Sequence, residues 1–157
     1  MPKTLTLLEV YKILRNFQGP QHWWPGETQD EIIIGAILTQ NVSWNNVVKA
    51  LNNLHSAGIY TLKDLDALSV EAIAPLIRST LYYNQKALKL KTFTNFLRER
   101  YQFDLKQMFD TDLKTLRSEM LKLKGLGPET VDSILLYAGS KPVFVVDAYR
   151  KLATTLS

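Results

Sequence analysis

Two glycines placed two residues apart, between segments with helical periodicity, constrain the fold of this chain most. They are Gly125 and Gly127 in the stretch LKLKGLGPETVDSILLYA, and Pro128 follows them directly. Glycine is needed where φ is positive or where another backbone comes close, and proline suits the first turn of a helix, where its missing N–H costs nothing. The stretch therefore predicts two helices, at 112–123 and 129–138, joined by a tight turn.

The turn also offers backbone groups that suit an anion. Leu126, between the glycines, is expected to point into the core and anchor the turn. Glu129 and Thr130 then lie at the start of the second helix, where backbone N–H groups form an anion site. Gly-x-Gly alone is a weak signal, so this stretch by itself favours a structural helix–helix turn over phosphate binding.

Helical periodicity dominates the rest of the chain. A first helix carries apolar residues on one face from Leu5 to Leu14, and the Gly- and Pro-containing stretch 17–29 is typical of a loop. Ser43 is the expected N-cap of one helix, and only PVFVV at 142–146 resembles a strand. Further helices are predicted at 29–40 (almost uniformly apolar and therefore buried), 43–57, 69–78 and 84–101, with a last one starting near residue 147. The pattern predicts an all-α single domain over 1–157.

Composition excludes several classes of protein. The 157 residues include no cysteine, which excludes disulfides, thiolate zinc sites and an iron–sulfur cluster within this chain. No apolar run approaches the ~20 residues of a membrane span, and the N-terminus is expected to form an amphipathic helix rather than a signal peptide. A net charge of +4 leans toward a polyanionic partner.

An aspartate ends the apolar run VFVV near the end of the chain. Asp147 is a favoured N-cap for the last predicted helix, and capping is the more common role of such a residue. The functional alternative is a carboxylate held beside apolar surface, where it stabilises positive charge or activates water. The two roles can coexist.

With the hairpin and the aspartate both in view, the chain resembles the helix–hairpin–helix, Gly/Pro-Asp superfamily of DNA glycosylases, which includes endonuclease III. GAILTQNVSWNNVVKAL (35–51) and LYYNQKALKL (81–90) resemble the family's Gln-bearing turn and its Tyr-Asn-x-Lys-Ala segment. The similarity is colinear over nearly the whole chain and implies a bilobal helix–hairpin–helix glycosylase fold, with the hairpin at 112–138 and the Asp-bearing segment at 139–152. The matching positions are Leu123, Gly125, Gly127, Thr130 and Val131 in the hairpin, then Gly139, Pro142, Val146 and Asp147.

Departures from the family pattern indicate which branch of the superfamily this chain resembles most. Members that also cut at abasic sites carry a lysine two residues after the second glycine, where this chain has Glu129. A carboxylate cannot form the Schiff base of β-elimination, so no lyase activity is expected. Glu129, HisTrpTrpPro (22–25) and QNVSW (40–44) are most similar to the 3-methyladenine DNA glycosylase III branch. Family members continue well past the Asp-bearing helix, so the fold is expected to be incomplete at the C-terminus.

The resemblance implies a base pocket built largely from aromatic side chains. A base removed from duplex DNA must be flipped out, and indole faces both stack on it and attract a cationic alkylated purine. The alternative is that the tryptophans fill the core, which is favoured for Trp23. The expected pocket residues are Trp23, Trp24, Pro25, Trp44 and Glu129.

The resemblance also implies a set of DNA contacts. Gln40, beside Asn41 in the turn, fills the gap left by the flipped base, although a helix C-terminal residue can simply bond to backbone. Tyr82 and Tyr83 press on the opposite strand. Lys86 is an expected phosphate contact, with a solvated lysine face as the alternative. The hairpin grips a phosphate through Gly125, Leu126, Gly127 and Thr130, with a monovalent cation on its carbonyls as the only cofactor expected.

Together these features predict base excision repair by hydrolysis of the N-glycosidic bond of alkylated purines such as 3-methyladenine. Asp147 would stabilise the oxocarbenium-like sugar or activate the attacking water. The expected partner is damaged double-stranded DNA, and the expected state is a cytoplasmic, nucleoid-associated monomer in a bacterium. Two alternatives stay open, namely a non-catalytic helix–hairpin–helix DNA-binding module and a glycosylase for another damaged base.

Overall fold

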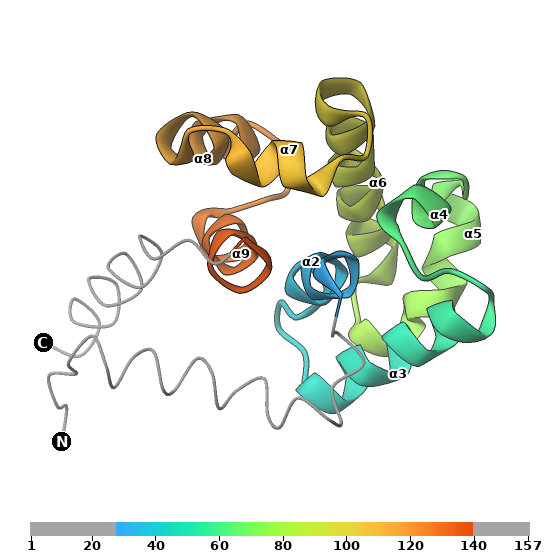
Figure 1. The fold of residues 1–157 in the computed structure, drawn as a ribbon. Helices are drawn as coiled ribbons and strands as arrows, with labels where there is room; N and C mark the ends of the chain where they lie inside the picture. Colours follow the sequence, from blue (N-terminus) through green and yellow to red (C-terminus); the bar gives the residue numbers. More distant parts are fainter. Residues whose placement is uncertain (1–27, 140–157) are drawn as a thin grey trace, which may run out of the picture.

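The computed structural model describes residues 28–139, and all of the regular structure in that part of the chain is helical (Figure 1). The all-α fold class is thereby confirmed. The first predicted helix, the strand-like segment 142–146 and the helix near Asp147 lie outside the described residues. The elements are α2 (Gln29–Leu38), α3 (Trp44–Ser56), α4 (Leu62–Asp66), α5 (Val70–Ile73), the 3₁₀ segment η1 (Ala74–Thr80), α6 (Tyr83–Tyr101), α7 (Leu105–Asp110), α8 (Leu113–Leu121), α9 (Pro128–Ser133) and the π turn η2 (Ile134–Ala138).

Short polar side chains begin most of these helices. Ser43 accepts a hydrogen bond from the backbone N–H of Asn46, so its predicted role as the N-cap of α3 is confirmed. Two short helices were not predicted, α4 and α7, although each also has a cap. Thr61 forms a capping box with Asp64 at α4, and Asp104 accepts from the Gln107 N–H at α7. Elements this short carry too little apolar periodicity to stand out in the sequence.

The helix predicted at 69–78 is divided in two. Ser69 caps α5 as expected of a helix start, but α5 ends at Ile73 and the chain continues as the 3₁₀ segment η1. Pro75 explains the change, because it has no N–H for the helical ladder. At the end of η1, Leu81 and Tyr82 both have positive φ, 57° and 46°, which turns the chain sharply into α6.

The apolar helix α2 lies at the centre of the described fold (Figure 1). It contacts α3, α6, α9 and η2, and its Ile33, Ile37 and Leu38 are fully buried, as its apolar sequence predicted. The long helix α6 packs on α4, α5 and η1 along one part and on α7 along another. Two groups of helices, α3 to η1 and α7 to η2, therefore meet across α2 and α6, which agrees with the expected bilobal arrangement.

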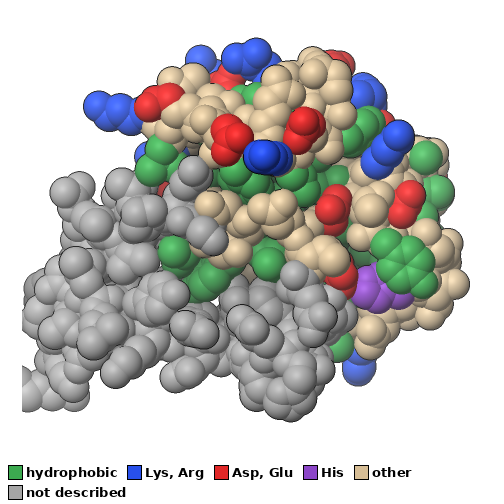
Figure 2. All heavy atoms as spheres, viewed as in Figure 1, with side chains coloured by type: hydrophobic (Ala, Val, Ile, Leu, Met, Phe, Trp, Pro, Cys, Tyr) green, Lys and Arg blue, Asp and Glu red, His purple; other side chains and the backbone are tan. Residues whose placement is uncertain are grey.

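None of the helices between residues 28 and 139 combines the length and the apolar character that a membrane crossing requires. On the face seen in Figure 2, lysine and arginine side chains alternate with aspartate and glutamate and do not gather in one basic patch.

Candidate functional site

The two glycines of the hairpin have different backbone requirements. Gly125 has φ +89°, and a Cβ there would lie 2.8 Å from Cγ of Lys89. Gly127 has φ −86° and ψ 175°, an extended conformation open to any residue, and a Cβ there would meet no atom within 4 Å. Only Gly125 is therefore required by the fold of the turn, whereas Gly127 leaves open space in front of the backbone. Leu126 is 4% exposed, so its predicted anchoring in the core is confirmed.

An ion pair that the sequence analysis did not predict joins the two helices of the hairpin. Arg117 of α8 donates from Nε to Oδ1 of Asp132 at 2.7 Å and from Nη2 to Oδ2 at 3.1 Å. Asp132 of α9 is buried, so this two-pronged bond is shielded from water on the carboxylate side. Arg117 and Asp132 hold the direction of α9, and with it the position of Glu129 and Thr130.

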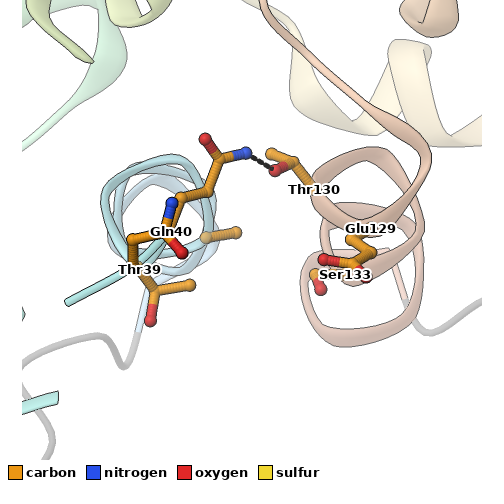
Figure 3. Close-up of a pocket in the computed structure, with 7 residues that line it drawn as sticks. Thr39, Gln40, Glu129, Thr130 and Ser133 are labelled. Carbon is orange, nitrogen blue, oxygen red and sulfur yellow. Dashed lines mark hydrogen bonds between the residues drawn. The ribbon is translucent and has the colours of Figure 1, made fainter. Parts of the chain in front are cut away.

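The turn after α2 carries the glutamine predicted to enter DNA. Thr39 caps the helix, Gln40 follows, and Asn41 has φ 55°, so the turn is sharp and exposes Asn41. The side-chain amide of Gln40 reaches the hairpin, where Nε2 donates to Oγ1 of Thr130 at 2.5 Å (Figure 3). Its Oε1 accepts from Nζ of Lys89 at 2.8 Å. Gln40 thus connects α2, α6 and α9, and the buried hydroxyl of Thr130 faces Gln40 rather than solvent.

Lys86 has a different place from the one predicted. Its side chain is 2% exposed, and Nζ donates to the backbone carbonyl of Gln40 at 2.8 Å and to that of Thr80. Burial, together with the smaller effect of the nearby Lys89 charge, lowers the pKa of Lys86 to about 8. A phosphate contact does not fit this geometry, because the ammonium is enclosed and already bonded to two carbonyls.

A cleft lies between the end of α2 and the start of α9. Its volume is about 320 Å³, and Figure 3 shows Glu129 and Ser133 on α9 across from Thr39 and Gln40. The lining residues are Ala36, Thr39, Gln40, Asn41, Glu129, Thr130 and Ser133. Sequence reasoning missed Ala36, Thr39 and Ser133. The helical spacing from Ala36 to Thr39 and Gln40, and the i, i+4 spacing from Glu129 to Ser133, place these residues on shared faces and could have indicated them.

A second, smaller hollow of about 160 Å³ adjoins the first at Gln40 and Asn41. Four residues predicted to serve DNA binding meet there with two further residues, Gln85 and Lys89. Tyr82 is 64% exposed at its rim, whereas Tyr83 is half-buried, with the Arg78 guanidinium 5.7 Å from its ring centroid. The hollow is lined by Gln40, Asn41, Tyr82, Gln85, Lys86 and Lys89.

The expected aromatic wall is described only in part. Trp44 is the first residue of α3 and is half-buried against the hydrophobic core. Trp23, Trp24, Pro25 and Asp147 lie outside the described residues, so the pocket and catalytic roles assigned to them stay predictions. Among residues 28–139, no three His, Cys, Asp or Glu side chains are arranged to share a metal ion. A monovalent cation at the hairpin also stays a prediction.

Residues 34–155 match the family described as HhH-GPD superfamily base excision DNA repair protein. A protein of Methanocaldococcus jannaschii, provisionally named a DNA repair glycosylase, is 46% identical over 92% of this chain and 66% of its own length. Endonuclease III of Thermotoga maritima is 27% identical over 75% of this chain and 51% of its own. The chain therefore spans two thirds or less of the length of these relatives.

The chain is also similar, in both fold and sequence, to a protein of known structure. That protein is the H. pylori 3-methyladenine DNA glycosylase bound to 1,N6-ethenoadenine, which superposes with a TM-score of 0.71 at 30% identity. The match covers 86% of this chain and 64% of that one. The all-α helix–hairpin–helix fold is shared between the two proteins.

Proposed function

Since the chain belongs to the HhH-GPD superfamily of base excision DNA repair proteins, we propose that it is a DNA N-glycosylase without lyase activity. Its substrates are alkylated purines such as 3-methyladenine in double-stranded DNA. The similarity to a 3-methyladenine DNA glycosylase supports this substrate class.

One observation carries the proposal, namely the position of Glu129 in the cleft opposite Thr39 and Gln40 (Figure 3). By the family resemblance, this is the position where members that cut at abasic sites carry a lysine. A carboxylate has no amine to condense with the sugar aldehyde, so β-elimination through a Schiff base is excluded at this position. A negative carboxylate in the cleft also attracts a base that carries positive charge.

The proposed reaction is hydrolysis in place of β-elimination. A cationic base leaves with the electron pair of the N-glycosidic bond and needs little proton donation. Water then forms the new bond to the anomeric carbon and loses a proton. Asp147 stabilises the oxocarbenium-like sugar and orients or deprotonates that water, while Trp24 and Trp44 stack on the flipped base.

The test of the missing lyase activity is borohydride trapping on DNA with an abasic site. Wild type is expected to form no covalent complex, and Glu129→Lys is expected to form one, because it places an amine in the cleft. Glu129→Gln is the matched control without an amine. Trapping by wild type at the level of Glu129→Lys would contradict the proposal.

The test of the glycosylase activity is single-turnover release of methylated bases from alkylated duplex DNA. Wild type is expected to release 3-methyladenine without cutting the strand. Asp147→Asn is expected to lose about 10²-fold or more in rate, as when one electrostatic stabiliser of a transition state is removed. Salt-sensitive DNA binding with no release by wild type would instead favour a non-catalytic DNA-binding module.

The polar groups of the cleft also favour a second candidate function, in which the substrate is a different damaged base. Besides Gln40, the cleft presents Thr39, Asn41 and Ser133, which are hydrogen-bonding groups that can read the edge of a base. The same release assay should therefore include duplexes with an oxidised pyrimidine, 8-oxoguanine and a mismatched base. Faster release of one of these bases than of 3-methyladenine would identify that lesion as the preferred substrate.

A further inference from the structure

Lys86 is a buried cation whose position none of the functional assignments explains. It lies in the first turn of α6, and its backbone N–H bonds to the carbonyl of Tyr82. The acceptors of its ammonium are the carbonyls of Gln40 and Thr80, not a carboxylate. Enclosing a charged amine without an opposite charge is unfavourable, so a side chain such as leucine would be the simpler choice for packing alone.

The two carbonyls belong to the two irregular segments beside the hollow. Gln40 lies in the turn after α2, directly before Asn41 with φ 55°. Thr80 ends η1, directly before Leu81 and Tyr82, which also have positive φ. One ammonium therefore joins the turn after α2 to the link between η1 and α6, two segments that contain positive-φ residues and lie far apart in the sequence.

The side chain of Gln40 is held separately from its backbone. Its amide bonds to Lys89 and Thr130, and Lys89 is only partly buried, so this contact is open to exchange with a solvent-side partner. The backbone carbonyl of Gln40 is bonded instead by Lys86, whose side chain is only 2% exposed. The turn can therefore keep its shape while the Gln40 side chain leaves the hairpin.

We propose that Lys86 is a positioning residue, which fixes the Gln40 turn and the 80–82 segment so that Gln40 and Tyr82 are presented together to duplex DNA, without contacting DNA itself. The proposal rests on the proposed function in one respect, that Gln40 enters the duplex. If it is correct, the effect of removing Lys86 depends on the presence of the Gln40 side chain.

The experiment is a double-mutant cycle on DNA binding. The DNA is a duplex with a tetrahydrofuran abasic analogue beside 2-aminopurine, whose fluorescence reports insertion at the gap. The proteins are wild type, Gln40→Ala, Lys86→Met and the double variant, because methionine fills a similar volume without N–H donors. Lys63→Met is the matched control, since Lys63 is an exposed lysine of α4 and loses the same charge.

Lys86→Met is expected to lower affinity about tenfold and to reduce the fluorescence change, as Gln40→Ala does, and the double variant is expected to lose less affinity than the two single losses combined. The slope of log affinity against log salt should match wild type, because no phosphate contact is lost. Lys63→Met should bind as wild type does. Additive effects together with a salt slope reduced by about one would identify Lys86 as a phosphate contact and overturn the proposal. Unchanged affinity and fluorescence in Lys86→Met would overturn it as well.

A second measurement needs no substitution, in case Lys86→Met does not fold. The ¹³Cε signal of Lys86 is followed against pH in lysine-labelled protein, with and without the abasic-analogue duplex. The pKa of an enclosed ammonium is expected to be the same with and without the duplex. A rise in the Lys86 pKa of about one unit on adding DNA would indicate a new phosphate partner and overturn the proposal. Neither experiment measures base release, so a wild type that binds this DNA but releases no base would contradict the glycosylase proposal and leave that of Lys86 intact.

Discussion

At the scale of single residues, the two glycines of the hairpin look alike in the sequence, but the structure requires glycine at only one of the two positions. Gly125 is needed for its backbone, because φ is +89° and Lys89 fills the space where a side chain would begin. Gly127 meets neither condition. A glycine without a structural requirement, at the start of a helix in a DNA-repair family, is expected to serve the approach of another molecule.

We therefore expect Gly125→Ala to reduce stability and Gly127→Ala to reduce DNA binding. Gly125→Ala should lower the free energy of unfolding by about 1–3 kcal/mol, because the left-handed backbone is strained and Lys89 must move. Gly127→Ala should change it by less than about 1 kcal/mol but weaken binding to duplex DNA. Urea unfolding and a DNA titration of both variants test this, and equal loss of stability in the two would refute it.

The buried lysine makes stability depend on pH at the alkaline end. Lys86 has a pKa of about 8 in the folded protein against an ordinary 10.5, so the unfolded chain binds more protons between these values. The free energy of unfolding of wild type, relative to Lys86→Met, should therefore rise as pH increases from about 8 to 10.5. The neutral amine still has N–H groups for both carbonyls. Urea unfolding of both proteins at pH 7, 9 and 10.5 measures the difference, and a constant difference would show that the ammonium is not desolvated.

At the scale of elements, the hairpin is built from helices that cannot be stable alone. The helix α8 has nine residues and α9 has six, below the length at which isolated helices persist. Their orientation depends on Leu126 in the core and on the pair of Arg117 with Asp132. The π turn η2 extends α9 to Ala138, where the carbonyl accepts from the Gln29 side chain at 2.8 Å and ties the hairpin to α2.

Asp132→Asn should lower the free energy of unfolding by about 1–3 kcal/mol, because the buried charge partner of Arg117 is lost. Amide hydrogen exchange should accelerate in α9 more than in α3, since the pair acts within the hairpin. Asp110→Asn, an exposed residue of α7, is the control and should change little. Uniform acceleration across all helices would mean that the pair supports the whole fold and not the hairpin in particular.

At the scale of the whole molecule, α2 is the element on which both groups of helices depend. It contacts α3 on one side and α9 with η2 on the other. Its C-terminal end also delivers Thr39 and Gln40 to the cleft. The stability of the fold and the geometry of the site therefore share one helix.

Ile37→Ala should lower the free energy of unfolding by about 2–5 kcal/mol, because Ile37 is fully buried and a cavity would remain. Both helix groups should still unfold in one transition, since α2 couples them. Urea unfolding followed by circular dichroism and by NMR signals from α3 and α8 tests this, with the exposed Leu88→Ala as control. Separate midpoints for α3 and α8 would contradict the coupling.

Local features of the sequence predicted the longer helices and several of their caps, and the family resemblance predicted the family. Ser43 as a cap, Pro128 at the start of α9 and the buried apolar stretch of α2 all follow from interactions between residues close in the chain. Such interactions depend on a few neighbouring residues, so a pattern can reveal them. The short helices α4 and α7 escaped because five or six residues hold too little periodicity.

Only the tertiary structure decided what the polar side chains of the site do. The bond from Gln40 to Thr130 spans 90 residues, and the bond from Lys86 to the Gln40 carbonyl spans 46. Lys86, Lys89 and Lys91 look alike on a helix in the sequence, yet one is enclosed and the others are partly exposed. Burial of a charged group depends on which distant backbone carbonyls the fold brings to it, and no local pattern contains that information.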